Sequence, residues 1–215
     1  MTTADEHAHY LYYKLVNGHF GTSTEDICLD FIDQCGSNNF YDIKINYWNL
    51  LSYACYLGYA KVAFRIMDYA DINLTCEDGW TPLMCAVVGT IRSNSQIKHD
   101  IVKELIRRGA DVNYKSVTPD SEGFSALSVA CSHRDESMVI TLIKAGAHFV
   151  DIMNSHIYDK NVPEIEQCIR DIYHEQIIAV INTERTDETS NNAMAASFRT
   201  TYAVELVGII AEFII

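Results

Sequence analysis

The sequence predicts an all-α fold in which similar helix pairs repeat along the chain and stack as a solenoid. One observation is the segment Asp78–Ala86, which has the residues of a tight turn followed by the start of a helix. A second is the segment Leu105–Asn113, in which Gly109 suits the end of the paired helix. A third is that both patterns recur before and after these segments, which indicates a repeated structural unit.

The first helix of the central pair is predicted to begin at Pro82. Gly79 suits a tight turn, where φ is often positive. Thr81 is a natural N-cap, since its hydroxyl accepts a hydrogen bond from an otherwise unpaired backbone N–H. Pro82 has no N–H, and none is needed at the first helical position. Leu83 and Ala86 lie three residues apart and therefore share one buried face of the helix.

Taken together, these segments resemble one ankyrin repeat, whose usual pattern is D-x-x-G-x-T-P-L-H-x-A, a helix pair, and then L-L-x-x-G-A-D-V-N. Met84 stands where the family usually has His, so the hydrogen bond of that His is expected to be missing. The resemblance implies β-hairpin fingers between the helix pairs. It also implies that the chain binds another protein rather than catalysing a reaction.

The central helix pair is repeated on both sides. Its N-cap, Thr81, lies 32 residues after the equivalent Asn49, close to the family period of 33. The next equivalent residue, Ser125, lies 44 residues after Thr81, so about eleven residues are inserted. The repeated segments are Asn49–Gly58 and Val62–Met67 upstream, and Ser125–Cys131 and Met138–Ala147 downstream.

The inserted residues fall in two polar stretches that are predicted to be surface loops. One stretch, Thr90–Gln96, lies between the helices of the central repeat, and the other, Tyr114–Glu122, lengthens the following finger. Surface insertions cost little chain entropy, so both stretches could be tolerated without a role. Alternatively, the long finger contacts a partner, since loops often carry function.

The two ends of the array are predicted to be degenerate repeats that cap it. At the N-terminus, His7–Val16 and Thr24–Ile32 have the pattern of a helix pair, and Gly36 suits its end. At the C-terminus, Asp151–Lys160 is a candidate first helix, and Pro163–Ile172 has the apolar spacing of a helix start. The predicted array spans residues 1–160, with repeats at 7–44, 45–77, 78–120 and 121–150, and a helical extension follows at 161–215.

The last part of the chain is predicted to be a loop, Glu184–Asn192, followed by a helix, Ala193–Ile215. About thirteen residues at its end are mostly apolar, whereas a membrane-spanning helix needs about twenty. Glu205 and Glu212 also interrupt the apolar run. We therefore expect an amphipathic helix that packs on the last repeat, with a partner-binding or dimerising helix and membrane contact as alternatives. The apolar end is either buried or belongs to a longer protein.

The composition restricts the partner and the compartment. The chain of 215 residues has a net charge of −13, which disfavours nucleic acid and anionic membranes as partners. A protein with a basic or a mixed apolar and basic face would complement it, although the acidity could also serve solubility alone. The polar, acidic start is unlike a signal peptide, and the odd number of cysteines, seven, suggests a reducing compartment. We expect a cytoplasmic protein, in the host cytoplasm if it is a secreted effector.

No set of residues has the spacing of a catalytic, cofactor or metal site. His7 and His9 lie near each other but have no third ligand nearby. Cys131 and His133 lie two apart, and side chains two apart on a helix point in different directions. We expect no catalytic residue, no cofactor and no metal, and therefore not an enzyme.

The candidate binding residues surround three aromatic side chains at one equivalent position of the repeats. Trp48, Trp80 and Phe124 each precede the N-cap of a first helix, a position that is normally exposed in the family, so stacking would place them in a row. Aromatic residues are favoured anchors at interfaces. Alternatively, they fold onto neighbouring fingers and only stiffen the array. The predicted protein-binding residues are Trp48, Tyr56, Leu57, Glu77, Asp78, Trp80, Val88, Ser121, Glu122, Phe124, Ser132 and His133.

The predicted function is a protein–protein interaction module that binds a partner through its concave helix face and finger tips. Such a module acts as an adaptor, a scaffold or an inhibitor. One version of this hypothesis is a pathogen effector that acts on host proteins. The alternative is an interaction or regulatory region of a larger multidomain enzyme whose catalytic part lies beyond Ile215. We expect a monomer, or a weak homo-oligomer formed through the C-terminal helix.

Overall fold

The computed structural model describes residues 3–18, 22–36, 39–89, 95–149 and 163–186. The chain divides into two compact units, Met1–Ile157 and Tyr158–Ile215, and each is described by itself. In the described part of the second unit there is one long helix, α10, at Pro163–Thr186. Its start agrees with the predicted helix start at Pro163.

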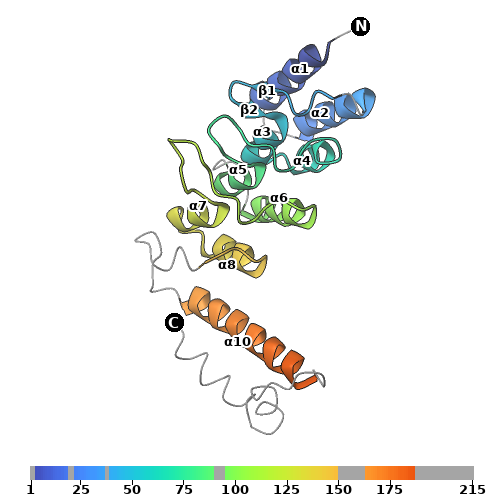
Figure 1. The fold of residues 1–215 in the computed structure, drawn as a ribbon. Coiled ribbons are helices and arrows are strands. Elements are labelled where there is room, and N and C mark those ends of the chain that lie inside the picture. The colour runs from blue at the N-terminus through green and yellow to red at the C-terminus, as the bar shows by residue number, and fades with distance from the viewer. Residues whose placement is uncertain (1–2, 19–21, 37–38, 90–94, 150–162, 187–215) are drawn as a thin grey trace. The chain divides into compact units, whose positions relative to one another are not determined.

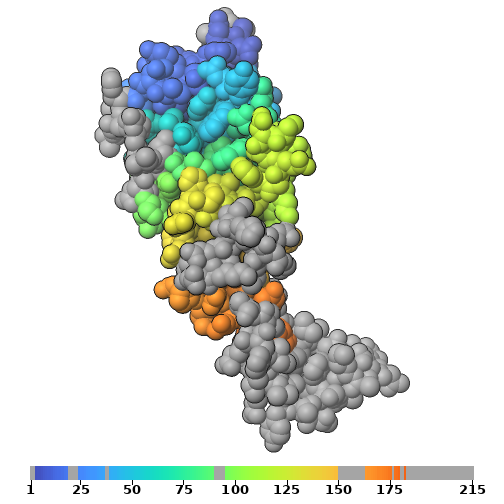
Figure 2. All heavy atoms as spheres, turned by 90° about the vertical axis from the view of Figure 1, so that its left-hand side faces the viewer, coloured from blue at the N-terminus to red at the C-terminus, as the bar shows by residue number. Residues whose placement is uncertain are grey.

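The first unit is built of helix pairs that stack in chain order (Figure 1). The first helices contact one another in the order α1, α3, α5 and α7, and the second helices α2, α4 and α6 do the same. Figure 2 shows the repeats of this unit following one another along one face. The predicted all-α ankyrin solenoid is confirmed. The helices are α1 (Ala4–Asn17), α2 (Thr22–Cys35), α3 (Leu50–Leu57), α4 (Ala60–Ile66), α5 (Pro82–Val88), α6 (Ser95–Arg107), α7 (Ala126–Ser132) and α8 (Glu136–Lys144).

The first helices begin where the N-cap residues predict. The Oγ1 atom of Thr81 accepts a hydrogen bond from the backbone N–H of Met84 at 3.3 Å, and Pro82 is the first residue of α5. Asn49 caps α3 and Ser125 caps α7 through equivalent bonds of 2.8 and 3.2 Å. Because the same cap recurs in all three repeats, the three first helices start at equivalent places.

Hairpin-like fingers separate the helix pairs. The first contains two short antiparallel strands, β1 (Lys44–Ile45) and β2 (Trp48–Asn49), joined by Asn46 and Tyr47, which both have positive φ. The next two described fingers close with bonds of 2.8 Å instead, from the N–H of Cys76 to the carbonyl of Trp80 and from the N–H of Ser116 to the carbonyl of Phe124. The fingers implied by the resemblance are therefore present, mostly as turns.

Two asparagine side chains join one finger base to the next. The amide of Asn73 donates to the carbonyl of Gly109 at 3.2 Å and accepts from the N–H of Asp111 at 2.8 Å. Asn113 repeats this arrangement: it donates to the carbonyl of Gly146 at 3.0 Å and accepts from the N–H of His148 at 2.7 Å. Each side chain therefore satisfies two backbone groups of the following repeat.

Replacing Asn73 by alanine is expected to lower the free energy of unfolding by about 1–3 kcal/mol, because two hydrogen bonds are lost and each contributes about 0.5–1.5 kcal/mol net. Denaturant unfolding followed by circular dichroism measures the loss. Asn17→Ala is the matched control, since that amide donates only within α1, to the carbonyl of Tyr13. An equal loss in both variants would contradict a role for Asn73 in joining repeats.

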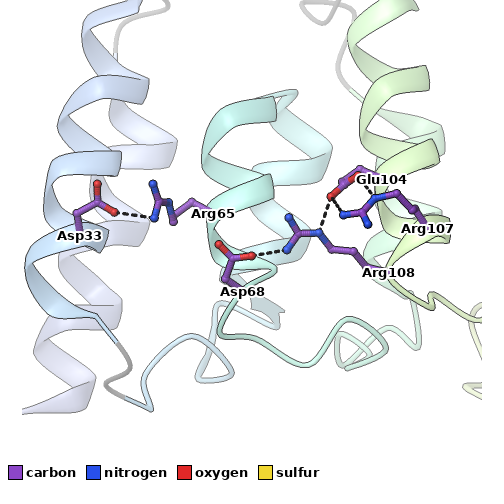
Figure 3. Close-up of polar contacts among 6 residues, drawn as sticks. All are labelled: Asp33, Arg65, Asp68, Glu104, Arg107 and Arg108. Atoms are coloured by element: carbon purple, nitrogen blue, oxygen red, sulfur yellow. Dashed lines mark hydrogen bonds and ion pairs between the residues drawn. The ribbon is translucent and has the colours of Figure 1, made fainter.

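Ion pairs link the second helices of neighbouring repeats and the residues that directly follow them (Figure 3). The guanidinium of Arg65 on α4 lies 3.3 Å from the carboxylate of Asp33 on α2. The guanidinium of Arg108, just after α6, lies 2.5 Å from the carboxylate of Asp68, just after α4. These contacts favour one register of each repeat on the next.

Glu104, on α6, binds the side chains of two arginines that follow it in the sequence. Its carboxylate accepts hydrogen bonds from Arg107 at 2.6 and 2.7 Å and from Arg108 at 2.6 Å. These bonds lower the pKa of Glu104 to about 2. The carboxylate therefore keeps its charge in the folded protein at pH values where it is partly protonated in the unfolded chain, near its usual value of about 4.3.

The stabilisation from Glu104 is expected to be fully present above about pH 5 and to be lost as the pH falls toward about 2. Wild type should melt a few degrees above Glu104→Gln at pH 7, and the difference should shrink between pH 5 and pH 3. Thermal melts at low salt measure it, because salt screens exposed charges. Glu122→Gln, on an exposed finger, is the control. A difference that is independent of pH would contradict this role for the carboxylate.

Several predicted helix boundaries were wrong, and two predictions lie outside the described residues. Helix α1 begins at Ala4, three residues before the predicted His7, where Thr3 caps it. Helix α6 begins at Ser95, inside the predicted loop 90–96, because Gln96 bonds Asp100 one turn on at 2.8 Å and the polar residues occupy the exposed face. Helix α2 begins two residues before the predicted start. Helix α10 continues into the predicted loop 184–192, since Glu and Arg are good helix formers.

The candidate helices 151–160 and 193–215 are outside the described residues. Among the helices that the structure describes, none is both long and apolar enough to cross a membrane.

Candidate functional site

The three aromatic residues predicted to form a row occupy the expected equivalent positions. Trp48, Trp80 and Phe124 each lie one residue before a capped first helix, so the cap fixes where each backbone enters α3, α5 and α7. Trp48 and Trp80 are partly buried, whereas Phe124 is 43% exposed.

Trp48 belongs to an aromatic cluster on the first of these repeats. Its ring centroid lies 5.3 Å from that of Tyr53 and 5.2 Å from that of Tyr56, both on α3. Tyr53 in turn lies 4.9 Å from Tyr12 on α1. Burial and a hydrogen bond with Tyr12 raise the pKa of Tyr53, so this phenol stays neutral.

Trp80 pairs with the aromatic residue of the following repeat. Its ring centroid lies 6.5 Å from that of Phe124, in an edge-to-face arrangement. Such pairs contribute about 0.5–1.5 kcal/mol to stability beyond the burial of their surface. The contact between Trp80 and Phe124 therefore also stiffens the array, as the alternative interpretation expects.

Both tryptophans line an open groove with a volume of about 560 Å³. This lies in the size range of sites that hold small molecules or short segments of a partner. Six of its eight lining residues were predicted from the sequence, and Tyr53 and Asp120 were not. The groove, called the aromatic groove below, is lined by Trp48, Tyr53, Tyr56, Asp78, Trp80, Val88, Asp120 and Ser121.

The long finger is anchored against the finger before it. The backbone carbonyl of Asp78 accepts hydrogen bonds from the Thr118 hydroxyl at 2.8 Å and the Ser121 hydroxyl at 2.6 Å. The hydroxyls of Ser116 and Ser121 share a third bond at 2.6 Å, and both side chains are buried. This inserted stretch is therefore an ordered part of the site, because it brings Asp120 to the aromatic groove.

The aromatic groove combines apolar walls with negative charge. Two of its lining residues, Asp78 and Asp120, carry exposed carboxylates. None of the described lining residues is a lysine or an arginine. The site can therefore stack flat groups on its aromatic rings and attract cations with its carboxylates.

The remaining predicted residues do not line the aromatic groove. Leu57 is partly buried at the end of α3, Glu77 and Glu122 are exposed on fingers, and Phe124 contacts the groove through Trp80. Ser132 and His133 are exposed at the end of α7. Their role in binding remains a prediction.

The two missed lining residues differ in how visible they are in the sequence. Tyr53 lies three residues before Tyr56, a spacing that places both on one face of α3, so helical periodicity alone could have identified it. Asp120 lies in the inserted finger, whose path depends on hydrogen bonds to the preceding finger. No pattern in the sequence indicates that path.

Of the described cysteines, six are buried and Cys35 is partly exposed, with a pKa that burial raises. Burial raises the pKa of Cys131 to about 11, which keeps this thiol protonated near neutral pH. A hydrogen bond from Cys85 lowers the pKa of Cys76 to about 7, but only 2% of Cys76 is exposed. Within the described ranges, no group of three or more His, Cys, Asp or Glu side chains could hold a metal ion.

Comparison with known proteins agrees with this architecture. Residues 19–116 match the family model for ankyrin repeats, in three copies. A putative ankyrin repeat protein of fowlpox virus, strain NVSL, is 35% identical over 74 residues. The match covers 34% of this chain and 20% of the viral protein, so the similarity spans about a fifth of that relative's length.

Proposed function

We propose that this chain, which contains ankyrin repeats in residues 19–116, binds a partner protein in its aromatic groove. Ankyrin repeats are generally non-catalytic modules for protein–protein interaction, and stacked repeats present extended concave binding surfaces. The observation that carries the proposal is the aromatic groove itself. Three successive repeats contribute to it, and both tryptophans of the chain line it.

The exposure of the aromatic rings favours binding over packing alone. A ring whose only role was to stiffen the array would bury its faces against neighbouring fingers. Trp48, Tyr56 and Trp80 instead remain partly exposed and line an open hollow. Partly exposed tryptophan and tyrosine with acidic neighbours match the usual composition of an interface hot spot and its polar rim.

In this proposal the protein is not an enzyme and acts as an adaptor, a scaffold or an inhibitor in the cytoplasm. The similarity to a fowlpox virus protein favours a partner from a host cell, as expected for an effector. The described cysteines are free thiols, as is usual for proteins of a reducing compartment.

Affinity capture from eukaryotic cytosolic extract tests the proposal, with the 215-residue chain as bait and mass spectrometry as readout. The test variant is Trp48→Ala combined with Trp80→Ala, and circular dichroism verifies that it is folded. The control is Tyr47→Ala, because Tyr47 is an aromatic residue that is 64% exposed on a finger but does not line the aromatic groove. We expect a protein that wild type and control retain and the test variant loses. A captured set that is the same for all three baits would contradict the proposal.

A further inference from the structure

We propose that the aromatic groove receives an arginine side chain, presented by a short segment of the partner. This inference rests on the proposed function and names the chemistry of the partner. It is carried by two features of the same site, its aromatic lining residues and its two acidic lining residues.

The two carboxylates favour a positively charged occupant. Asp78 comes from the second finger and Asp120 from the long third finger, and both line the aromatic groove. An apolar occupant would remove water from these carboxylates without replacing its hydrogen bonds, which is costly. The net charge of −13 adds a long-range attraction for a basic segment.

The aromatic walls favour arginine over lysine. A guanidinium group is planar, is weakly hydrated, stacks on aromatic faces and pairs with carboxylates through two parallel hydrogen bonds. The ammonium of lysine is a compact, strongly hydrated charge that neither stacks nor forms such a fork. Trp48, Trp80 and Tyr56 line the same groove as Asp78 and Asp120.

The site is held in place before the partner arrives. Asp120 lies beside Ser121, whose hydroxyl bonds the backbone carbonyl of Asp78 at 2.6 Å. The side chain of Ser121 thus links the finger that carries Asp120 to the backbone of Asp78 on the preceding finger. The volume of about 560 Å³ leaves room for residues on either side of the arginine, so the occupant is a segment of chain.

Tryptophan fluorescence measures occupancy directly, because the chain has two tryptophans and both line the aromatic groove. The probe is an acetylated and amidated peptide of four Arg-Gly units, titrated into the whole chain at low salt. Matched peptides replace arginine with citrulline, which keeps the shape and loses the charge, with lysine, or with leucine. We expect the arginine peptide to change the emission and to bind about tenfold more tightly than the others.

Carboxylate variants test where the peptide binds. Combining Asp78→Asn with Asp120→Asn should weaken the arginine peptide about tenfold. Glu122→Gln is the control, because this carboxylate is exposed on the same finger but does not line the aromatic groove. It should change the affinity less than about threefold, since only the long-range field is altered.

The outcomes separate this inference from the proposed function. Equal binding of the citrulline, lysine or leucine peptide, or an unchanged affinity in the double Asp variant, overturns the arginine assignment. Even if the arginine assignment is overturned, the proposed function stands as long as capture of a partner protein is lost in the Trp48→Ala, Trp80→Ala variant. If neither the peptides nor any captured protein depends on the tryptophans, the proposed function fails as well.

Discussion

Trp80→Ala is expected to reduce partner binding by at least about tenfold while the protein stays folded, because aromatic anchors at interface centres often contribute 2 kcal/mol or more. The free energy of unfolding should fall by about 1–2 kcal/mol. This is less than the 3–5 kcal/mol typical of a fully buried aromatic residue, since Trp80 is partly exposed and lines an open groove. Denaturant unfolding and quantitative capture of the partner measure the two effects on the same samples.

A double-mutant cycle with Phe124→Ala separates binding from packing. The two rings are in edge-to-face contact at 6.5 Å, so the cycle reports their interaction in the free protein. If Trp80 serves mainly to hold Phe124, the stability losses will be large and non-additive, and binding will fall only as far as folding does. That pattern would contradict the binding role of Trp80.

Gly79→Ala is expected to lower the free energy of unfolding by about 2–4 kcal/mol and to weaken partner binding. The φ angle of Gly79 is +76°, which costs a non-glycine residue about 1–2 kcal/mol. A Cβ atom there would also collide with the side chains of Ser116 and Thr118, which lie at the base of the long finger. These side chains would have to shift, which would disturb the bond of the Thr118 hydroxyl to Asp78, and we expect Asp120 to be displaced with the finger.

Gly123→Ala is the matched control for this effect. Its φ angle is +79°, but an added Cβ atom would meet nothing within 4 Å. The control should therefore show only the backbone cost, about 1–2 kcal/mol, and should bind the partner almost normally. Equal losses of stability and binding in the two variants would show that the contact between Gly79 and the long finger has no effect.

The fold could be predicted because its determinants are local. The helix starts follow from single residues whose side chains bond the backbone three positions on, as Thr81, Asn49 and Ser125 do. The recurrence of these caps, with apolar residues on one face, identifies the stacked helix pairs. Helix boundaries that lie among polar residues could not be predicted in the same way. Gln96, near the start of α6, suits a loop and an exposed helix face equally.

Most of the candidate site was predictable because it lies on repeated positions. Trp48 and Trp80 occupy equivalent places, and Tyr56 and Val88 lie on first helices, so the resemblance located them. Asp120 depends on an inserted finger that hydrogen bonds fix in space. The register of the repeats likewise depends on contacts between distant residues, such as the pair of Asp68 and Arg108, 40 positions apart.

Site-specific photocrosslinking tests the central claim, that the aromatic groove is where a partner protein binds, most directly. Tyr56→p-benzoylphenylalanine places the crosslinker in the aromatic groove, and Lys103→p-benzoylphenylalanine places it on the exposed face of α6. Each variant is irradiated in eukaryotic cytosolic extract. The proposal predicts a crosslinked protein from position 56 that is absent from position 103 and is lost when Trp80→Ala is added. A partner that crosslinks from position 103 and not from position 56 would contradict it.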